Sequence, residues 1–327
     1  MLETATVVRS FDPERSRALS AAVGRKGRLF LTGEGSSRIF PAKNAIRVAM
    51  QAGLGYTVRT DGARQAAGYE LSSYAVILAS NSGRTSEVVA LARALEESGN
   101  PDRYALTANE STVLESLCTG AFVLTCGPEA AVAATKSVVE QALFHESLIR
   151  RLGGRPWAGP MGKLADAMTA ALSADLEPAI VRAAADAPTI YFAGYNDGVA
   201  EELTLKTNEI TRKKADFLEG TYAVHGVEEV MDARDIVIVI DPVLEDIDKF
   251  REVLVDGVGL TVVAIADHDT PFPTIRIPRL ADGAPYVQLA AGWNLLVEVG
   301  LSLGIDLDTP RRARKVGNEA TGNEAEG

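Results

Sequence analysis

The residues best placed to do chemistry form one short loop with the sequence Ser80-Asn81-Ser82-Gly83-Arg84-Thr85. The apolar run Tyr74–Ala79 before it is typical of a buried parallel strand, and Ser86–Leu95 after it has a helical pattern. The first N–H groups of a helix lack intrahelical partners, and the helix dipole favours negative charge there. With added hydroxyl donors and the charge of Arg84, the loop is expected to bind the anionic end of a small molecule. The alternative is that its hydroxyls only cap the helix.

The elements that must position this loop alternate between strand and helix signals, which predicts an α/β fold with parallel sheets. The run Leu29–Thr32 leads through Gly33–Ser37 into a helix, and Thr189–Ala193 leads through Gly194–Gly198 into another. Because both halves begin in the same order, we predict two tandem doubly wound parallel-sheet domains of flavodoxin-like type.

Domain boundaries follow from the break at Gly153–Pro156 and from the composition of the C-terminus. We place the first domain at residues 1–155 and the second at 156–316. The Gly-, Asn- and Glu-rich segment 317–327 is predicted to be a disordered tail.

The composition of the 327 residues, 46% hydrophobic and 24% charged, is that of a globular protein. The net charge of −11 argues against a nucleic-acid partner and means that an anionic substrate needs local positive charge. No apolar run is long enough to span a membrane, and the N-terminus lacks a signal-peptide pattern, so we expect a cytoplasmic protein without a membrane partner.

The cysteine and histidine content limits cofactor chemistry. The two cysteines, Cys118 and Cys126, form no disulfide framework and are interpreted as packing residues. Together with His145, His225 and His268 they provide no metal-ligand spacing. We therefore expect neither a metal nor another cofactor.

Six segments, in this order along the chain, carry a resemblance to a known family: Gly35-Ser36-Ser37, Ser80–Thr85, Gly127–Lys136, Lys206-Thr207-Asn208-Glu209-Ile210, Val224-His225-Gly226 and Asp308–Lys315. From about Leu29 to Lys315 the chain resembles the tandem SIS (sugar isomerase) domain family. Its layout is similar to the isomerase half of glucosamine-6-phosphate synthase and to stand-alone two-SIS isomerases, deaminases and deglycases. The synthase has a cysteine directly after its initiator methionine, whereas residue 2 here is Leu, so we expect no glutaminase domain.

The resemblance implies three catalytic residues. Glu209 matches the glutamate that moves a proton between C1 and C2 of an open-chain sugar, a role that suits a carboxylate with a raised pKa. His225 matches a histidine that assists ring opening and comes from the neighbouring subunit, which implies a homodimer with a shared active site. Lys315 matches a lysine that forms a Schiff base, for which its amine must be partly deprotonated. The alternatives are a solvated helix glutamate, a capping histidine and a basic tail.

The resemblance also implies the residues that bind the small anionic sugar substrate. The anion is expected against the Ser80–Thr85 loop and the first glycine turn, and the sugar hydroxyls against a wall after the fifth strand signal. Arg38, Arg84 and Ala134 depart from the residues of the synthase, which makes the pocket more cationic and changes the wall. The predicted binding residues are Ser36, Ser37, Arg38, Ser80, Asn81, Ser82, Arg84, Thr85, Glu129, Val132 and Ala134.

The leading hypothesis is an aldose–ketose isomerase, or a related amino-sugar deaminase, that acts on a 6-phosphorylated sugar. A second hypothesis is isomerisation of a sulfonated hexose, which the added arginines favour. A third is a non-catalytic sugar-phosphate sensor. The Glu209 and His225 pair argues against the third, because binding alone does not require an acid and a base.

Overall fold

The computed structural model describes residues 1–129, 131–157, 161–314 and 318–320. The chain divides into two compact units, which are described separately. One consists of Thr6–Met161 with Arg312–Gly327, and the other of Met1–Ala5 with Gly162–Arg311. The domain boundaries predicted between residues 155 and 156 and between residues 316 and 317 stay predictions.

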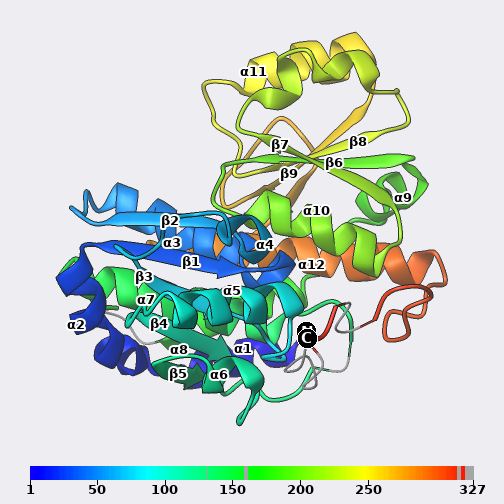
Figure 1. Ribbon diagram of the computed structural model, residues 1–327. Coiled ribbons are helices and arrows are strands. Elements are labelled where there is room, and N and C mark those ends of the chain that lie inside the picture. Colours follow the sequence, from blue (N-terminus) through cyan, green and yellow to red (C-terminus); the bar gives the residue numbers. More distant parts are fainter. Residues whose placement is uncertain (130, 158–160, 315–317, 321–327) are drawn as a thin grey trace. The chain divides into compact units, whose positions relative to one another are not determined.

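The unit that contains Thr6–Met161, here the anion-loop unit, is built on a parallel sheet of five strands in the order β2-β1-β3-β4-β5 (Figure 1). The inner strand β3 is buried along its whole length, as its continuous Ala-Val-Ile-Leu-Ala run predicts. The strands are β1 Arg28–Gly33, β2 Thr57–Gly62, β3 Ala75–Ala79, β4 Arg103–Thr107 and β5 Gly120–Val123.

Helices cover both faces of this sheet, because apolar side chains alternate onto both. On one face α7 packs against α3 and α2, and on the other α5 packs against α4 and α6. The helices are α1 Glu3–Ser10, α2 Arg17–Lys26, α3 Ile39–Gln51, α4 Ala63–Ala66, α5 Ser86–Glu97, α6 Val113–Ser116 and α7 Lys136–Leu152, with 3-10 turns at Pro13–Ser16 and Gly35–Ser37.

The second unit repeats the architecture with a parallel sheet in the order β10-β9-β8-β6-β7. If strands are numbered from the start of each half, the two orders are the same, which confirms the predicted tandem α/β fold. Its strands are β6 Thr189–Gly194, β7 Lys214–Glu219, β8 Ile236–Ile240, β9 Thr261–Ala266 and β10 Thr274–Arg276.

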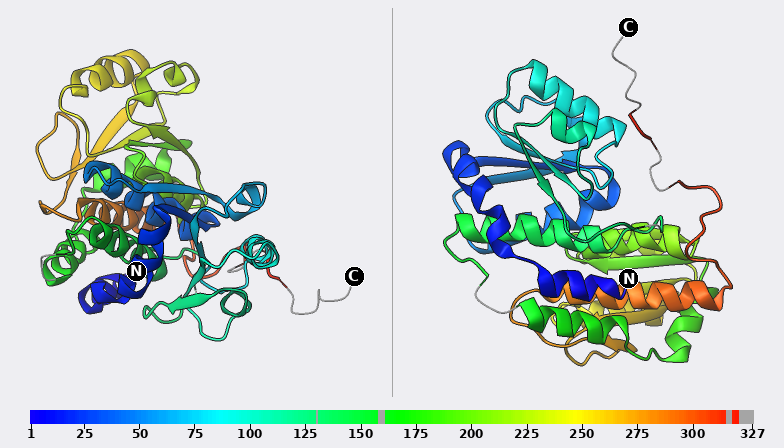
Figure 2. Two further views of the ribbon diagram at one scale, coloured as in Figure 1. Left: turned by 60° about the vertical axis from the view of Figure 1, so that its left-hand side comes forward. Right: turned by 90° about the horizontal axis from the view of Figure 1, so that it is seen from below.

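The helices of the second unit also form two layers. Figures 1 and 2 show α10 (light green) and α12 (orange) side by side on one face of the sheet and α11 on the other. The central helix α12 is buried nearly all round, as its apolar sequence predicts. The helices are α8 Met161–Leu172, α9 Pro178–Asp186, α10 Val199–Ile210, α11 Ile247–Phe250 and α12 Ala284–Ser302, with 3-10 turns at Tyr222–Val224 and Val227–Val230 and a π-helical segment at Arg251–Val258.

Across the described part of the chain, no helix combines the length and apolarity that crossing a membrane would need.

Candidate active site

The predicted anion loop lies at the topological switch point of its sheet. The chain leaves β1 through α3 toward β2, and leaves the neighbouring strand β3 through α5 toward β4. At the carboxyl ends of the strands, the loops Gly33–Arg38 and Ser80–Thr85 therefore lead away from each other in opposite directions. Open α/β sheets bind their ligands at this position. The structure thus brings together the predicted residues of both loops.

Close packing joins these two loops. A Cβ atom on Gly33 would lie 2.8 Å from the Ala79 carbonyl oxygen and 3.2 Å from the Ser37 Cβ atom. Only glycine fits between them without a shift of backbone. Ser36, Ser37 and Arg38 consequently follow Gly33 directly beside the end of β3, and all three are half-buried.

Hydrogen bonds within the Ser80–Thr85 loop hold its hydroxyl groups in place. The hydroxyl oxygens of Ser80 and Thr85 lie 2.8 Å apart, and the Ser82 hydroxyl accepts from the Arg84 N–H at 3.2 Å. The Asn81 carbonyl accepts from the Ala108 N–H at 3.0 Å. Arg84 itself is exposed, so its charge is available to an anion in solution.

The segment 318–320 returns to this loop, which the sequence did not predict. The Asn318 carbonyl accepts from the Ser86 N–H at 3.1 Å, and the Ala320 N–H donates to the Arg84 carbonyl at 2.8 Å. Glu319 pairs with Thr85 as an antiparallel bridge. One of the unpaired N–H groups at the start of α5 is thereby occupied. The rest of the predicted disordered tail, 317 and 321–327, lies outside the described residues.

Gly83 gives a direct test of the loop. Its φ is +64°, and an added Cβ would lie 2.4 Å from the Thr112 Cβ, so Gly83→Ala is expected to destabilise the protein by about 2 kcal/mol or more and to weaken binding of inorganic phosphate. Gly99→Ala is the matched control, because Gly99 has φ +72° and open space around it. Thermal unfolding and phosphate titration measure both effects; equal stability losses in the two variants would contradict the close fit against Thr112.

The predicted sugar wall lies before α7, and Glu129 caps that helix. Its carboxylate accepts from the N–H groups of Thr135 and Lys136, each at 2.8 Å, and from the Ser137 N–H at 3.2 Å. These donors are first-turn groups without intrahelical partners. The structure therefore shows a capping role for Glu129, and its predicted contact with sugar hydroxyls stays a prediction. Val132 and Ala134 lie half-buried in the same loop.

In the second unit, Glu209 stands near the C-terminal end of α10 in an ion pair. The Lys206 ammonium lies 2.6 Å from the Glu209 carboxylate and 3.4 Å from that of Glu202. Lys206 and Glu202 are fully buried, while the Glu209 side chain keeps 22% of its exposure. Burial acts to lower the pKa of Lys206, but the two carboxylates outweigh it and raise that pKa, so the ammonium stays charged.

Lys206 is not among the site residues that the sequence predicts. The available signal was spacing, since residues three and four apart share one face of a helix, and Glu202, Lys206 and Glu209 follow that spacing. Their burial, which separates this group from an ordinary solvated helix face, depends on α12 and β7 packing against α10.

His225 lies beyond the carboxyl ends of the strands of the same sheet, whereas Glu209 lies toward their amino ends. It follows β7 and the turn Tyr222–Val224, is exposed, and places its Nε2 3.2 Å from the Thr221 hydroxyl. Helix α10 runs back from the carboxyl ends of the strands toward their amino ends, so the stretch from Val199 to Glu209, about 15 Å of helix, separates the level of Glu209 from that of His225. One chain therefore does not bring the two residues together. Lys315 lies outside the described residues.

Among the other candidates for reactive side chains, His145 and Cys126 are buried and Cys118 is half-buried. Burial lowers the pKa of His145 to about 3, which keeps it neutral, and raises the pKa of both Cys118 and Cys126 to about 12. Thiols with so high a pKa are poor nucleophiles. Within the described ranges, no group of histidine, cysteine and carboxylate residues could hold a metal ion.

Comparison with known proteins identifies the fold of this chain. No family model and no curated protein sequence matches the chain. Tagatose-6-phosphate ketose/aldose isomerase from Escherichia coli superposes with a TM-score of 0.75 at 19% identity, over 95% of each chain. The chain has the tandem sugar-isomerase fold.

Two other solved structures share this tandem sugar-isomerase fold. The C-terminal domain of glucosamine-fructose-6-phosphate aminotransferase from Francisella tularensis has a TM-score of 0.72 at 17% identity, over 91% of this chain and 96% of that one. Glucosamine-6-phosphate deaminase from Thermotoga maritima has a TM-score of 0.68 at 17% identity, over 93% of this chain and 98% of that one. At this identity the likeness concerns the fold alone.

Proposed function

We propose that this protein is an enzyme of the SIS family, an aldose–ketose isomerase or related amino-sugar deaminase for a 6-phosphorylated sugar. The observation that carries the proposal is the partly exposed Glu209 carboxylate held by the buried Lys206 ammonium. The ion pair fixes the position of this carboxylate on a rigid helix, and a group that transfers a proton must be held in a fixed position. The fold of the solved isomerases and of the deaminase supports the same reaction class.

The proposed mechanism assigns one task to each group. Glu209 removes the proton from C2 of the open-chain aldose and returns it to C1, while the hydroxyl proton of O2 passes to O1, so that C1 becomes an alcohol and C2 a ketone; the reverse reaction exchanges these positions. Lys206, which neutralises Glu209 in the resting state, stabilises negative charge that develops during the transfer. The Ser80–Thr85 loop, with Arg84, holds the phosphate. His225 assists ring opening. Lys315 is proposed to form a Schiff base with the ketose.

Glu209 and His225 lie at opposite ends of the strands of one sheet, which supports the further proposal of a homodimer with a shared site. Both residues cannot reach one sugar from the same chain if about 15 Å of helix separates them along the strand direction. A second copy can supply the missing histidine to each site. We place this dimer in the cytoplasm.

A sulfonated hexose is the second candidate substrate, and Arg38 and Arg84 favour it. Guanidinium groups bind any three-oxygen anion in a fork, including one with a single charge. Exposed Arg84 and half-buried Arg38 flank the two loops at the switch point. The sensor hypothesis is less well supported, because binding does not need a buried lysine to hold Glu209.

The proposal is tested by proton exchange in D₂O, followed by NMR, with a panel of sugar 6-phosphates, amino-sugar 6-phosphates and one 6-sulfo sugar. Deuterium at C1 or C2 of one compound is the expected result and identifies the substrate class. Ammonia release alongside it assigns a deaminase. If one compound binds but no compound exchanges its protons, the enzyme proposal is overturned and the sensor hypothesis remains.

A further inference from the structure

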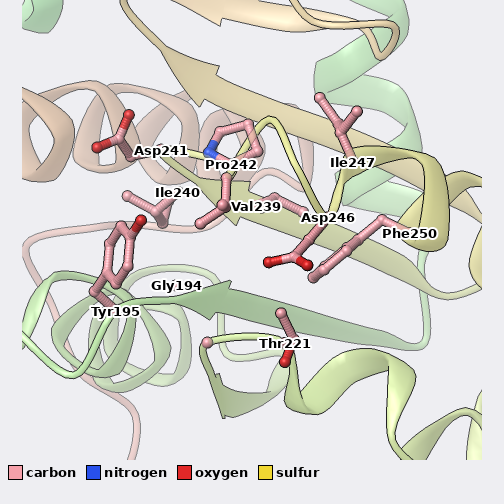
Figure 3. Close-up of a pocket in the computed structure, with 12 residues that line it drawn as sticks. Gly194, Tyr195, Thr221, Val239, Ile240, Asp241, Pro242, Asp246, Ile247 and Phe250 are labelled. Atoms are coloured by element: carbon pink, nitrogen blue, oxygen red, sulfur yellow. The ribbon is translucent and has the colours of Figure 1, made fainter.

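The second unit has a cavity at its own switch point. The chain leaves β6 through α10 toward β7 and leaves β8 through α11 toward β9, so the loops after β6 and β8 part there. Between them lies a cavity of about 240 Å³, lined among others by Tyr195, Thr221, Asp246 and Phe250 (Figure 3). This is the position at which α/β sheets bind ligands, and the proposed reaction does not use it.

The charge of this switch point is opposite to that of the first. At the first, fifth and sixth positions after the strand, the chain has Ser80, Arg84 and Thr85 after β3, but Asp241, Glu245 and Asp246 after β8. Hydroxyl donors and a cation are replaced by three carboxylates. Among the described residues that line the cavity, there are two aspartates and no basic side chain. An anion is therefore repelled where the other unit attracts one.

The side chains in the cavity fit an organic cation. Figure 3 shows the Asp246 carboxylate and the Phe250 ring directed into the space between Tyr195 and Thr221, with the Asp241 carboxylate pointing away from Asp246. Carboxylates attract an ammonium group, and aromatic faces bind it by a cation–π interaction. Val239, Ile240 and Ile247 provide apolar walls for a hydrocarbon body.

Two properties of the lining residues agree with a negatively charged ligand site. Asp241 has φ +50°, a left-handed conformation uncommon outside glycine and found preferentially at functional sites. Burial, followed by the carboxylates of Asp241, Asp246, Glu245 and Asp197, raises the pKa of Tyr195. The phenol therefore stays protonated in a negative environment.

We propose that this cavity, formed by Asp246, Tyr195 and Phe250 at the second switch point, binds a small aliphatic ammonium compound. A short-chain amine such as pentylammonium combines the ammonium group and the hydrocarbon body that this lining is proposed to bind. The ammonium group pairs with Asp246 and lies against the aromatic rings, and the chain lies against the apolar wall.

The test is a ligand-observed NMR titration of the full chain with pentylammonium, pentan-1-ol and pentanoate, which have similar shape and different charge. Pentylammonium is expected to bind about tenfold or more tightly than the alcohol, and Asp246→Asn to remove that difference. Asp248→Asn is the matched control, because this exposed carboxylate lies two residues away and outside the lining. Tyr195→Leu is expected to weaken binding about two- to fivefold without loss of an acidic group.

Thermal unfolding verifies that each variant is folded. If Asp246→Asn does not fold, Tyr195→Leu still tests the proposal, because Tyr195 is half exposed and its substitution is expected to leave the fold intact. Equal affinity for the ammonium and the alcohol would overturn the proposal. So would preference for pentanoate, or no saturable binding of pentylammonium up to about 10 mM. The titration needs no turnover, so its outcome is independent of the proposed isomerase activity.

Discussion

Glu209→Gln is expected to lower kcat by about 10²–10⁴-fold, the usual contribution of a positioned acid–base group. The amide keeps the shape of the side chain and accepts a hydrogen bond from Lys206, but it cannot take a proton from the sugar. Because the Ser80–Thr85 loop is unchanged, the dissociation constant of the sugar phosphate is expected to stay within about threefold of the parent value. Exchange in D₂O and equilibrium titration measure the two effects separately.

Glu298→Gln is the matched control for this variant. Glu298 is an exposed glutamate on helix α12 of the same unit, and its substitution is expected to leave both constants unchanged. Full exchange activity in Glu209→Gln would exclude proton transfer by this carboxylate. An equal loss in Glu298→Gln would assign the effect to a change in charge rather than to catalysis.

Mixing Glu209→Gln with a second variant, His225→Gln, tests whether the active site is shared between two chains. In a dimer made of one chain of each kind, one site has both substitutions and the other has neither. Random mixing of two inactive proteins is then expected to restore about a quarter of the parent activity, because half of the dimers are mixed and each has one intact site. No recovery after verified subunit exchange would contradict a site shared between chains.

Lys206→Met is expected to have the largest effect on stability, a loss of about 3–5 kcal/mol in the free energy of unfolding. The substitution leaves the carboxylate of fully buried Glu202 close to that of Glu209 without the cation between them. Chemical denaturation followed by circular dichroism measures this loss. If Lys206 also stabilises charge in the transition state, kcat is expected to fall at temperatures where the variant remains folded.

Lys249→Met gives the matched control, because Lys249 and Glu252 form an exposed ion pair with the same spacing of three residues. Exposed pairs contribute about 0–1 kcal/mol, so this variant is expected to change stability little. The double variant Glu202→Gln with Lys206→Met is expected to recover part of the loss, since it removes a buried charge. Similar losses for Lys206→Met and Lys249→Met would contradict the structural role of burial.

Much of the fold and one part of the site follow from local sequence signals. The continuous apolar run at β3 predicts a strand buried on both faces, and the alternation of strands and helices predicts parallel sheets. Gly33 and Gly83 predict turns at the ends of strands, where a side chain would collide with the Ala79 backbone or with Thr112. The predicted anion loop is contiguous in sequence, so its residues, Ser80 to Thr85, could be proposed without a structure.

Other features depend on contacts between residues far apart in the chain. The sequence shows Lys206 and Glu209 on one helix face, but only packing against α12 and β7 makes the pair buried. The cap that Glu129 provides for α7 and the return of 318–320 to the start of α5 also have no local signal.

The sequence by itself therefore determined the strands, the turns and the position of the predicted anion loop between β3 and α5, because each depends on neighbouring residues and on the period of the apolar pattern. Only the tertiary structure decided the environment of Glu209, the opposite ends of the strands at which Glu209 and His225 lie, and the acidic cavity at Asp246. The physical reason is that burial and electrostatic field are sums over side chains from several elements, and the local sequence does not contain them.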